Sequence, residues 1–373
     1  MPRSDIDVHP KDETELCEIL SEAQDPVRIS GGDTRSDFSI DANGLSTLGL
    51  SGIVDYVPGA LTMVARTGTP LSEIQSVLAA EGQQLAFEPS DYKSVLNRSG
   101  TSTIGGVFAT NSSGARRIQC GAARDFLLGV RFVDGQGKLI KNGGRVMKNV
   151  TGYDLVKLMA GSWGTLGVMS EVSFKVLPAH EKTASLLLEI RNHNVAVAAM
   201  AAALGSPYDV SGAAYLPGSG ACMIRVEGFE KSVAHRLNGL QGRLKEFGKI
   251  ELLYDQEAKS RWEDLRCLSP FCDVSGDLWR ISVKPSDGPK VYEKAAFTKG
   301  FYDWAGGLIW GIAEPDVDPR LALNGVGGHA TRVRGAAREI AKFHPPSKAI
   351  AAINAAIRKR FDPKGILNRG LMG

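Results

Sequence analysis

The chain has 373 residues, of which 43% are apolar and 23% are charged, and its formal net charge is +3. This composition is that of an ordinary globular protein, so it excludes a wholly disordered chain, and the length predicts two or three domains. The positive charges form no basic block, which argues against a nucleic-acid partner.

No run of apolar residues approaches the roughly 18 that a membrane-spanning helix needs, and the first residues lack the pattern of a secretory signal. We therefore expect a cytoplasmic protein. Its cysteines lack the spacing of a zinc or iron–sulfur site, so we expect reduced thiols and no metal. They are Cys17, Cys120, Cys222, Cys267 and Cys272.

Hydrophobic spacing in the first half of the chain predicts short helices and strands. The expected elements are a helix after Pro10, strands at 27–29, 53–56 and 62–66, a helix after Pro70, a hairpin at 127–140, a helix after Asp154 and a strand at 168–176. Thr69 and Pro70 predict the N-cap and first turn of their helix. The segment 99–125 predicts a long loop of small and hydroxylated residues, which is typical of a functional loop.

Glycine is unusually frequent, at 43 of 373 residues, or about 12% against a typical ~7%. The glycines gather at 31–32, 100–121, 129–167 and 325–328. Such clusters let the backbone approach a ligand closely, and several separate glycine loops are suited to binding phosphate groups through backbone N–H groups. Neither a Rossmann fingerprint nor a Walker A sequence accompanies them, and the loose match at 325–330 is not followed by a βαβ unit.

The second half shows a different pattern. Strands are expected at 185–191, 212–216, 221–227 and 250–254, with helices at 194–204 and 231–247. This order, βαββαβ, predicts a ferredoxin-like unit.

Seven segments resemble the flavin-binding domain of the vanillyl-alcohol oxidase superfamily. They are Ser30–Thr34, Thr103–Gly106, Asn111–Gly114, Arg124–Gly129, 146–155, Gly161–Val168 and Phe361–Asn368. Two later segments, Leu278–Ser282 and Gly327–Arg332, are similar to the FAD-binding subunits of bacterial glycolate oxidases.

The resemblance implies an α+β fold in three parts. Residues 1–181 would form a two-subdomain PCMH-type FAD-binding domain, and 182–325 a ferredoxin-like α+β cap domain that holds the substrate. Residues 326–373 would form a C-terminal segment that returns to the FAD-binding domain.

The resemblance also implies FAD as the cofactor and assigns residues to it. The pyrophosphate would be held by the loop Ser30, Gly31, Gly32, Asp33 and Thr34, and the ADP part would be contacted by Thr103, Ile104, Gly105 and Gly106. The flavin ring system would be approached by Asn111, Ser113 and Gly114, and the adenine side would be lined by Gly161, Gly164, Gly167 and Val168. The remaining cofactor residues would be Pro89, Ser90, Arg124 and Asp125. For each glycine, a plain turn is the alternative.

Two features qualify this assignment. Asp33 stands where many relatives have a small residue, and a carboxylate beside a pyrophosphate is a like-charge contact unless its side chain caps the loop. No histidine occurs between His9 and His180. Since covalent attachment in some relatives uses a histidine of these loops, we expect non-covalent FAD.

A small 2-hydroxy acid needs a cation for its carboxylate and a base for its hydroxyl proton. His329 with Arg332 and Arg334 is the first choice for these catalytic roles, and Arg280 is the second. The alternative is that His329 caps a turn and that the arginines are surface charges.

The resemblance implies oxidation of glycolate to glyoxylate, with hydride transfer to FAD. The implied partners are a larger flavin subunit and an iron–sulfur subunit through which electrons leave. The paired-histidine metal motif of related dehydrogenases is absent. Two alternatives therefore stay open: a non-catalytic relay or assembly subunit, and a dehydrogenase of another 2-hydroxy acid such as D-lactate. Attachment to the inner membrane through a partner is also left open.

Overall fold

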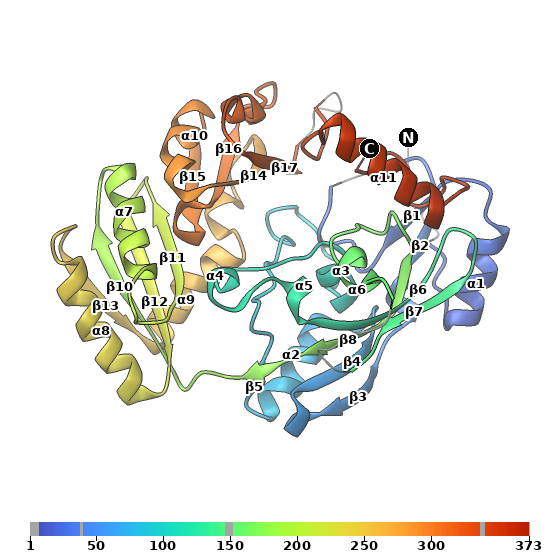
Figure 1. The fold of residues 1–373 in the computed structure, drawn as a ribbon, viewed down its shortest axis with the longest axis horizontal. Coiled ribbons are helices and arrows are strands. Elements are labelled where there is room, and N and C mark those ends of the chain that lie inside the picture. Colours follow the sequence, from blue (N-terminus) through green and yellow to red (C-terminus); the bar gives the residue numbers. More distant parts are fainter. Residues whose placement is uncertain (1–6, 38–39, 146–151, 336–339, 373) are drawn as a thin grey trace. The chain divides into compact units, whose positions relative to one another are not determined.

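The computed structural model describes residues 7–37, 40–145, 152–335 and 340–372. Contacts divide the chain into two units (Figure 1). Unit 1 comprises 1–113, 121–179 and 345–373, and unit 2 comprises 114–120 and 180–344. The chain therefore enters unit 2 twice, first with one short segment and then with a long one.

Two small sheets and one larger sheet form unit 1. Strand β1 (Val27–Ser30) pairs in parallel with β2 (Asn43–Ser46), and β5 (Gln83–Gln84) pairs with β9 (Leu177–Pro178). The five-stranded antiparallel sheet has the order β3-β4-β8-β6-β7. Its strands are β3 (Ile53–Val57), β4 (Thr62–Arg66), β6 (Leu127–Val133), β7 (Leu139–Gly143) and β8 (Val168–Lys175).

The helices of unit 1 are mostly short. They are α1 (Glu13–Glu22), α2 (Leu71–Ala80), α3 (Ile104–Ala109), α5 (Ala123–Phe126), α6 (Leu155–Met159) and α11 (Lys348–Phe361). Helix α1 is stabilised at its start and along one face. Asp12 caps it by accepting the N–H of Glu15, and Leu16 and Leu20 are fully buried against β1 and β2.

Two local features differ from the expectation. About half of the segment 99–125 is loop, as expected, but the rest forms three short helices, of which α3 is the longest. In α3, Thr103 accepts the N–H of Gly106, and Val107 and Phe108 are fully buried, so capping and packing outweigh the poor helix propensity of its glycines. Thr69 is not the N-cap of α2, which is Pro70. The hydroxyl of Thr69 instead accepts the N–H of Gly52.

The predicted βαββαβ unit is present in unit 2. It consists of β10 (Lys182–Glu189), α7 (His193–Leu204), β11 (Val210–Leu216), β12 (Ala221–Gly228), α8 (Glu230–Leu244) and β13 (Ile250–Tyr254). Its strands lie in the ferredoxin-like order β13-β10-β12-β11.

The chain then repeats this topology, which the sequence did not predict. After α9 (Asp255–Arg266) come β14 (Asp277–Val283), α10 (Gly288–Lys294), β15 (Lys299–Asp303), β16 (Leu308–Ala313), the 3-10 helix η6 (Pro319–Leu323) and β17 (Gly328–Arg334). Their order, β17-β14-β16-β15, matches the first set, and β11 pairs with β15 to give one eight-stranded sheet. The 3-10 helix η6 takes the place that α8 has in the first set. With only five residues, it is too short to show a recognisable hydrophobic periodicity.

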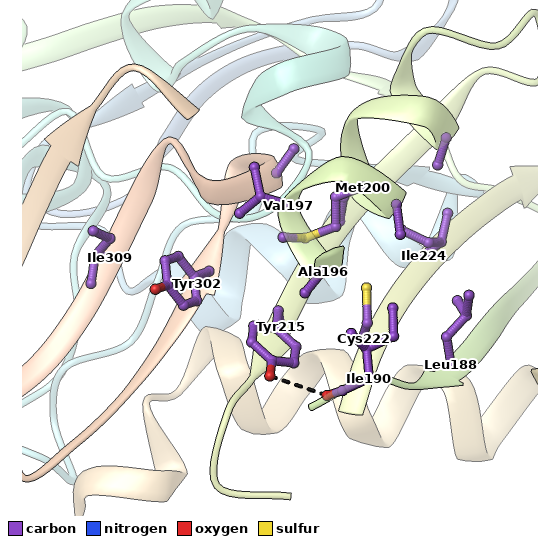
Figure 2. Packing of buried hydrophobic residues seen from close by; sticks show 14 of the residues in the cluster. Leu188, Ile190, Ala196, Val197, Met200, Tyr215, Cys222, Ile224, Tyr302 and Ile309 are labelled. Atoms are coloured by element: carbon purple, nitrogen blue, oxygen red, sulfur yellow. Dashed lines mark hydrogen bonds between the residues drawn. The ribbon is translucent and has the colours of Figure 1, made fainter. Parts of the chain in front are cut away.

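One face of this sheet forms the main core of unit 2. Side chains of α7, α8 and α10 pack on it, and Tyr215, Tyr302, Met200 and Cys222 lie at its centre (Figure 2). Because β17 pairs with β14, unit 2 extends to residue 344 rather than to the boundary expected at 325. None of the helices in the described part of the chain has both the length and the hydropathy to cross a bilayer.

Candidate functional site

A cleft opens in unit 1, and its empty space, which includes open solvent, is about 870 Å³. Three segments bring its walls together: the loop after β1, the start of α3, and the residues that lead into β8. Eleven of the predicted cofactor residues line it. They are Ser30, Gly31, Gly32, Asp33, Thr34, Thr103, Gly105, Gly106, Gly164, Gly167 and Val168.

The loop after β1 packs too tightly for side chains at its two glycines. A Cβ on Gly31 would lie 2.4 Å from Oγ1 of Thr103, and a Cβ on Gly32 would lie 1.7 Å from the carbonyl oxygen of Thr101. The loop therefore offers backbone to the cleft. The hydroxyl oxygen of Ser30, also in this wall, is buried without a hydrogen-bond partner among the described residues, so it is available to a polar ligand.

Asp33 does not place an unbalanced negative charge in the cleft. Its carboxylate oxygens lie 3.6 Å from Nη1 of Arg28 and 3.2 Å from Nη1 of Arg98. Arg28 also donates to both carboxylate oxygens of Asp7, at 2.9 and 3.1 Å. The four side chains together carry no net charge, so the like-charge objection to an anionic ligand does not hold.

Arg35 is a wall residue that the sequence reasoning missed. Its buried guanidinium donates to the carbonyl oxygen of Ser90 at 2.8 Å, to Oγ of Ser112 at 2.9 Å and to Oγ of Ser102 at 3.0 Å. These contacts fix a positive charge beside the glycine loop. Its position directly after Thr34 was the available signal.

The C-terminal segment completes the same cleft. Asn368 accepts the N–H of Ile29 at 2.8 Å and donates to the carbonyl oxygen of Trp163 at 2.7 Å. It thereby ties β1 to the loop 161–167, and both Asn368 and Trp163 line the cleft. Residues 345–373 belong to unit 1 by their contacts.

The other predicted cofactor residues lie outside the cleft lining, and several have structural contacts instead. Ile104 is fully buried, Ser113 accepts the N–H of Ala123, and Asn111 accepts the N–H of Arg124. The predicted residues outside the lining are Pro89, Ser90, Ile104, Asn111, Ser113, Gly114, Arg124, Asp125 and Gly161. Of the motif at 146–155, residues 146–151 lie outside the described residues.

The predicted catalytic residues lie in unit 2 on two neighbouring strands. Ser282 pairs with His329 and Arg280 pairs with Thr331, so Arg280 and His329 face the same side of the sheet. Arg332 pairs with Trp279 and faces the other side, where its Nη1 lies 3.4 Å from Oδ2 of buried Asp277.

The expected grouping of His329 with Arg332 therefore does not form. Positions 329 and 332 are three apart, and a strand alternates its side chains with period two. Arg280, the second choice, is the arginine that shares the face of His329.

The surroundings of His329 keep its ring neutral near pH 7. Part of the ring is open to solvent, but the loss of hydration where it packs on the protein lowers its pKa from the ordinary value of 6.5. The positive charges of Arg280 and Arg117 lower the pKa of His329 further. A neutral imidazole can accept a proton, which suits a general base.

Comparison with known proteins gives this geometry a context. Residues 4–143 match the family described as an FAD binding domain. Over 354 residues the chain is 36% identical to the glycolate oxidase subunit GlcE of Escherichia coli (strain K12), which covers 93% of this chain and 92% of that protein. The chain belongs to the GlcE family.

Two further similarities agree with membership of the GlcE family. Over 199 residues, 52% of this chain, it is 31% identical to the glycolate oxidase subunit GlcD of Bacillus subtilis (strain 168), of which it covers 41%. A solved alkyldihydroxyacetonephosphate synthase shares the fold, with a TM-score of 0.71 and 15% identity over 98% of this chain and 77% of that one.

Membership of the GlcE family confirms three predictions. The fold is an α+β flavoprotein fold with a PCMH-type FAD-binding domain, the cofactor is FAD, and the family is one of FAD-dependent oxidoreductases. The glycine loop, the buried Ser30 hydroxyl and the balanced charge of Asp33 fit a dinucleotide with a pyrophosphate.

Proposed function

We propose that this chain is the FAD-binding subunit of a glycolate-oxidising complex and converts glycolate to glyoxylate. The observation that carries the proposal is the glycine-lined cleft of unit 1 in a chain that matches GlcE over nearly its whole length. FAD, when bound, supplies a two-electron acceptor for the oxidation of the substrate.

The chain's own residues have separate tasks in this proposal. Backbone N–H groups of Gly31 and Gly32 and the hydroxyl of Ser30 hold the pyrophosphate. Arg280 binds the substrate carboxylate, and His329 accepts the proton of its hydroxyl group. Arg332 has no part in substrate binding, because its ion pair with Asp277 lies on the other face of the sheet.

A second candidate is a subunit that relays electrons or supports assembly without oxidising substrate. The placement of Arg332 favours it, since one of the expected substrate cations is absent from the His329 face. Reconstitution of the purified chain with FAD, followed by anaerobic addition of glycolate, separates the two candidates. Bleaching of the flavin absorbance supports oxidation by this chain, and bound flavin that stays oxidised supports the relay. D-lactate in the same assay tests the other hydroxy acid.

The partner subunits belong to the same proposal. Both relatives described above are named as subunits of glycolate oxidase, which supports a complex with a larger flavin subunit. An iron–sulfur subunit would then carry electrons onward, and docking at the inner membrane would take place through a partner. Affinity purification of the tagged chain, with iron and labile sulfide determined in the eluate, tests both partners. An eluate without a second flavoprotein and without iron contradicts this part of the proposal.

A further inference from the structure

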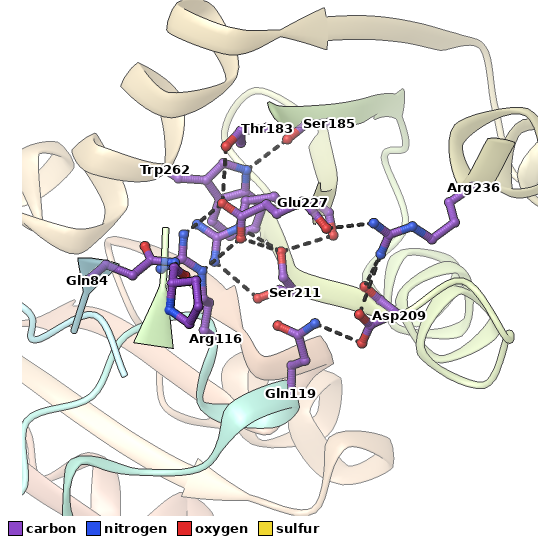
Figure 3. A network of polar contacts seen from close by, with 12 residues as sticks. Gln84, Arg116, Gln119, Thr183, Ser185, Asp209, Ser211, Glu227, Arg236 and Trp262 are labelled. Atoms are coloured by element: carbon purple, nitrogen blue, oxygen red, sulfur yellow. Dashed lines mark hydrogen bonds and ion pairs between the residues drawn. The ribbon is translucent and has the colours of Figure 1, made fainter. Parts of the chain in front are cut away.

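The short segment 114–120, which includes α4 (Arg117–Cys120), belongs to unit 2 although the chain on either side belongs to unit 1. Three contacts fix it there. Arg116 donates to both carboxylate oxygens of Glu227, at 2.8 and 2.7 Å, and Gln119 donates to Asp209 at 2.7 Å (Figure 3). The carbonyl oxygen of Gly114 accepts the indole N–H of Trp304 at 3.0 Å.

The anchor at Glu227 is a buried charge cluster. Ser211 and Thr183 donate their hydroxyl groups to its carboxylate (Figure 3). Nε of Arg225 lies 3.2 Å from the same carboxylate. Burial alone would raise the pKa of Glu227, but the charges of Arg225 and Arg116 lower it well below its ordinary value. Glu227 therefore stays ionised and holds Arg116 firmly.

This anchor determines the place of the next residue, Arg117. Its guanidinium carbon lies 4.8 Å from the ring centroid of Trp304, and that of Arg280 lies 4.9 Å from the same centroid. Both arginines are half-buried. Arg280 also lies 5.9 Å from the ring centroid of Trp310. Two segments that are far apart in sequence thus bring two guanidinium groups to one indole ring.

The backbone at Trp304 is held in an unfavourable conformation. Trp304 and Ala305 have φ angles of +52° and +56°, a left-handed pair that residues other than glycine adopt at a cost. Asp303 accepts the N–H of Trp304 at 2.7 Å and supports this turn. Strain of this kind is concentrated at ligand-binding and active sites.

The local charge is positive around His329. Two arginines, Arg280 and Arg117, act on its ring with their positive charges. Cations brought close together repel one another, and a bound anion relieves that repulsion. Planar guanidinium groups bind carboxylates through paired N–H···O hydrogen bonds.

We propose that Arg117 is a further substrate-binding residue, which joins Arg280 on Trp304 to form a carboxylate subsite beside His329. This inference rests on the proposed function and deepens it. The ligand class is a small 2-hydroxy or 2-oxo carboxylate, whose anionic end takes hydrogen bonds from both guanidinium groups. Glu227 acts through Arg116 as a positioning residue for Arg117.

Oxalate is a suitable probe because it presents a carboxylate and adjacent oxygen atoms and is not oxidised by the removal of a hydride. Its binding to the FAD-loaded full chain is measured by titration calorimetry, with FAD content and circular dichroism recorded for each variant. We expect Arg117→Gln and Arg280→Gln each to weaken oxalate binding at least tenfold at unchanged FAD content. The matched control Arg191→Gln removes an exposed arginine that is paired with Glu189 in the same unit, and leaves the affinity unchanged.

Wild-type affinity in Arg117→Gln, together with a loss in Arg280→Gln, overturns the inference and leaves the proposed function standing. Absence of oxalate binding to the wild-type chain overturns both the inference and the substrate site of the proposed function. If Arg117→Gln does not retain FAD, Arg117→Lys carries the test, because it keeps the charge but loses the paired donors. We expect oxalate binding at least threefold weaker in that variant, and unchanged binding contradicts the inference.

Discussion

Arg116 and Glu227 form a two-point ion pair in which the side chains are only 10% and 3% exposed, although 111 positions separate them in sequence. A buried charge that loses its partner is far more costly than an exposed one. Of the three contacts that hold segment 114–120 in unit 2, this pair is therefore the one whose loss leaves a buried charge without its partner.

Replacement of Glu227 by glutamine is expected to lower the free energy of unfolding by about 3–5 kcal/mol, because Arg116 and Arg225 lose the charge that compensates them. Urea-induced unfolding followed by circular dichroism measures the change. Glu251→Gln, at an exposed position of β13, is the matched control and is expected to change stability by less than about 0.5 kcal/mol. A loss below about 1 kcal/mol for Glu227→Gln would contradict the importance of the pair.

The contribution of Glu227 should also depend on pH. Its pKa in the folded chain lies below the ordinary value of 4.5, so the unfolded chain binds the proton first as the pH falls. The stabilisation is complete at neutral pH and declines as the pH drops below about 4.5 toward the folded pKa. The difference in unfolding free energy between wild type and Glu227→Gln, measured from pH 7 to pH 3, should stay constant at first and then shrink. A difference that grows on acidification contradicts this linkage.

The glycine loop is predicted to control cofactor affinity. Gly32→Ala places a Cβ against the carbonyl oxygen of Thr101 and should weaken FAD binding at least about tenfold, a loss of ~1.4 kcal/mol or more. Ser30→Ala removes one hydrogen-bond donor and should cost about 1 kcal/mol. Quenching of flavin fluorescence on binding gives both affinities. Gly59→Ala, where nothing lies within 4 Å of the added Cβ, should bind FAD as the wild type does.

If His329 is the base, kcat/KM for glycolate should rise with pH through a pKa below 6.5, because only the neutral ring accepts the proton. Arg280→Gln removes a positive charge that lowers this pKa, so the midpoint of the profile should move upward while the activity falls. Rapid mixing of the FAD-loaded chain with glycolate at different pH values gives the profile. A midpoint that is the same in both proteins would exclude His329 as the titrating group.

Arg332 is predicted to matter for stability and not for substrate binding. Arg332→Met removes the ion-pair partner of buried Asp277 and should lower the free energy of unfolding by about 3 kcal/mol. The folded variant should keep the wild-type KM for glycolate, since Arg332 faces away from His329. Steady-state kinetics below the unfolding temperature test this, and a tenfold rise in KM at unchanged stability would restore Arg332 to the substrate site.

Alternation of strand and helix signals was sufficient to predict the ferredoxin-like unit, because each of its elements is long enough to show its hydrophobic period. The second set of strands escaped notice because η6 is a five-residue 3-10 helix and α10 has only seven residues. Local patterning thus predicted long elements well and compact ones poorly.

The candidate sites show the same division. Glycine clusters predicted the cleft wall, because positions where a Cβ would clash require glycine and can therefore be recognised in the sequence. No local sequence pattern identifies Arg117, because its proposed role depends on contact with Trp304, which is far away in the sequence. Arg332 could have been excluded as a neighbour of His329 by counting strand positions.

The order in which the ribosome makes the chain has a consequence for both units. Segment 114–120 is synthesised well before β12, which carries Glu227, so Arg116 has no buried partner until much of unit 2 has emerged. In unit 1, the cleft lacks part of its wall until the end of synthesis, because Asn368 and Leu371 are made after almost all other residues. The wall of the cleft proposed for FAD is therefore finished only when synthesis has passed residue 371. On that proposal, cofactor capture would be one of the last steps in the maturation of the protein.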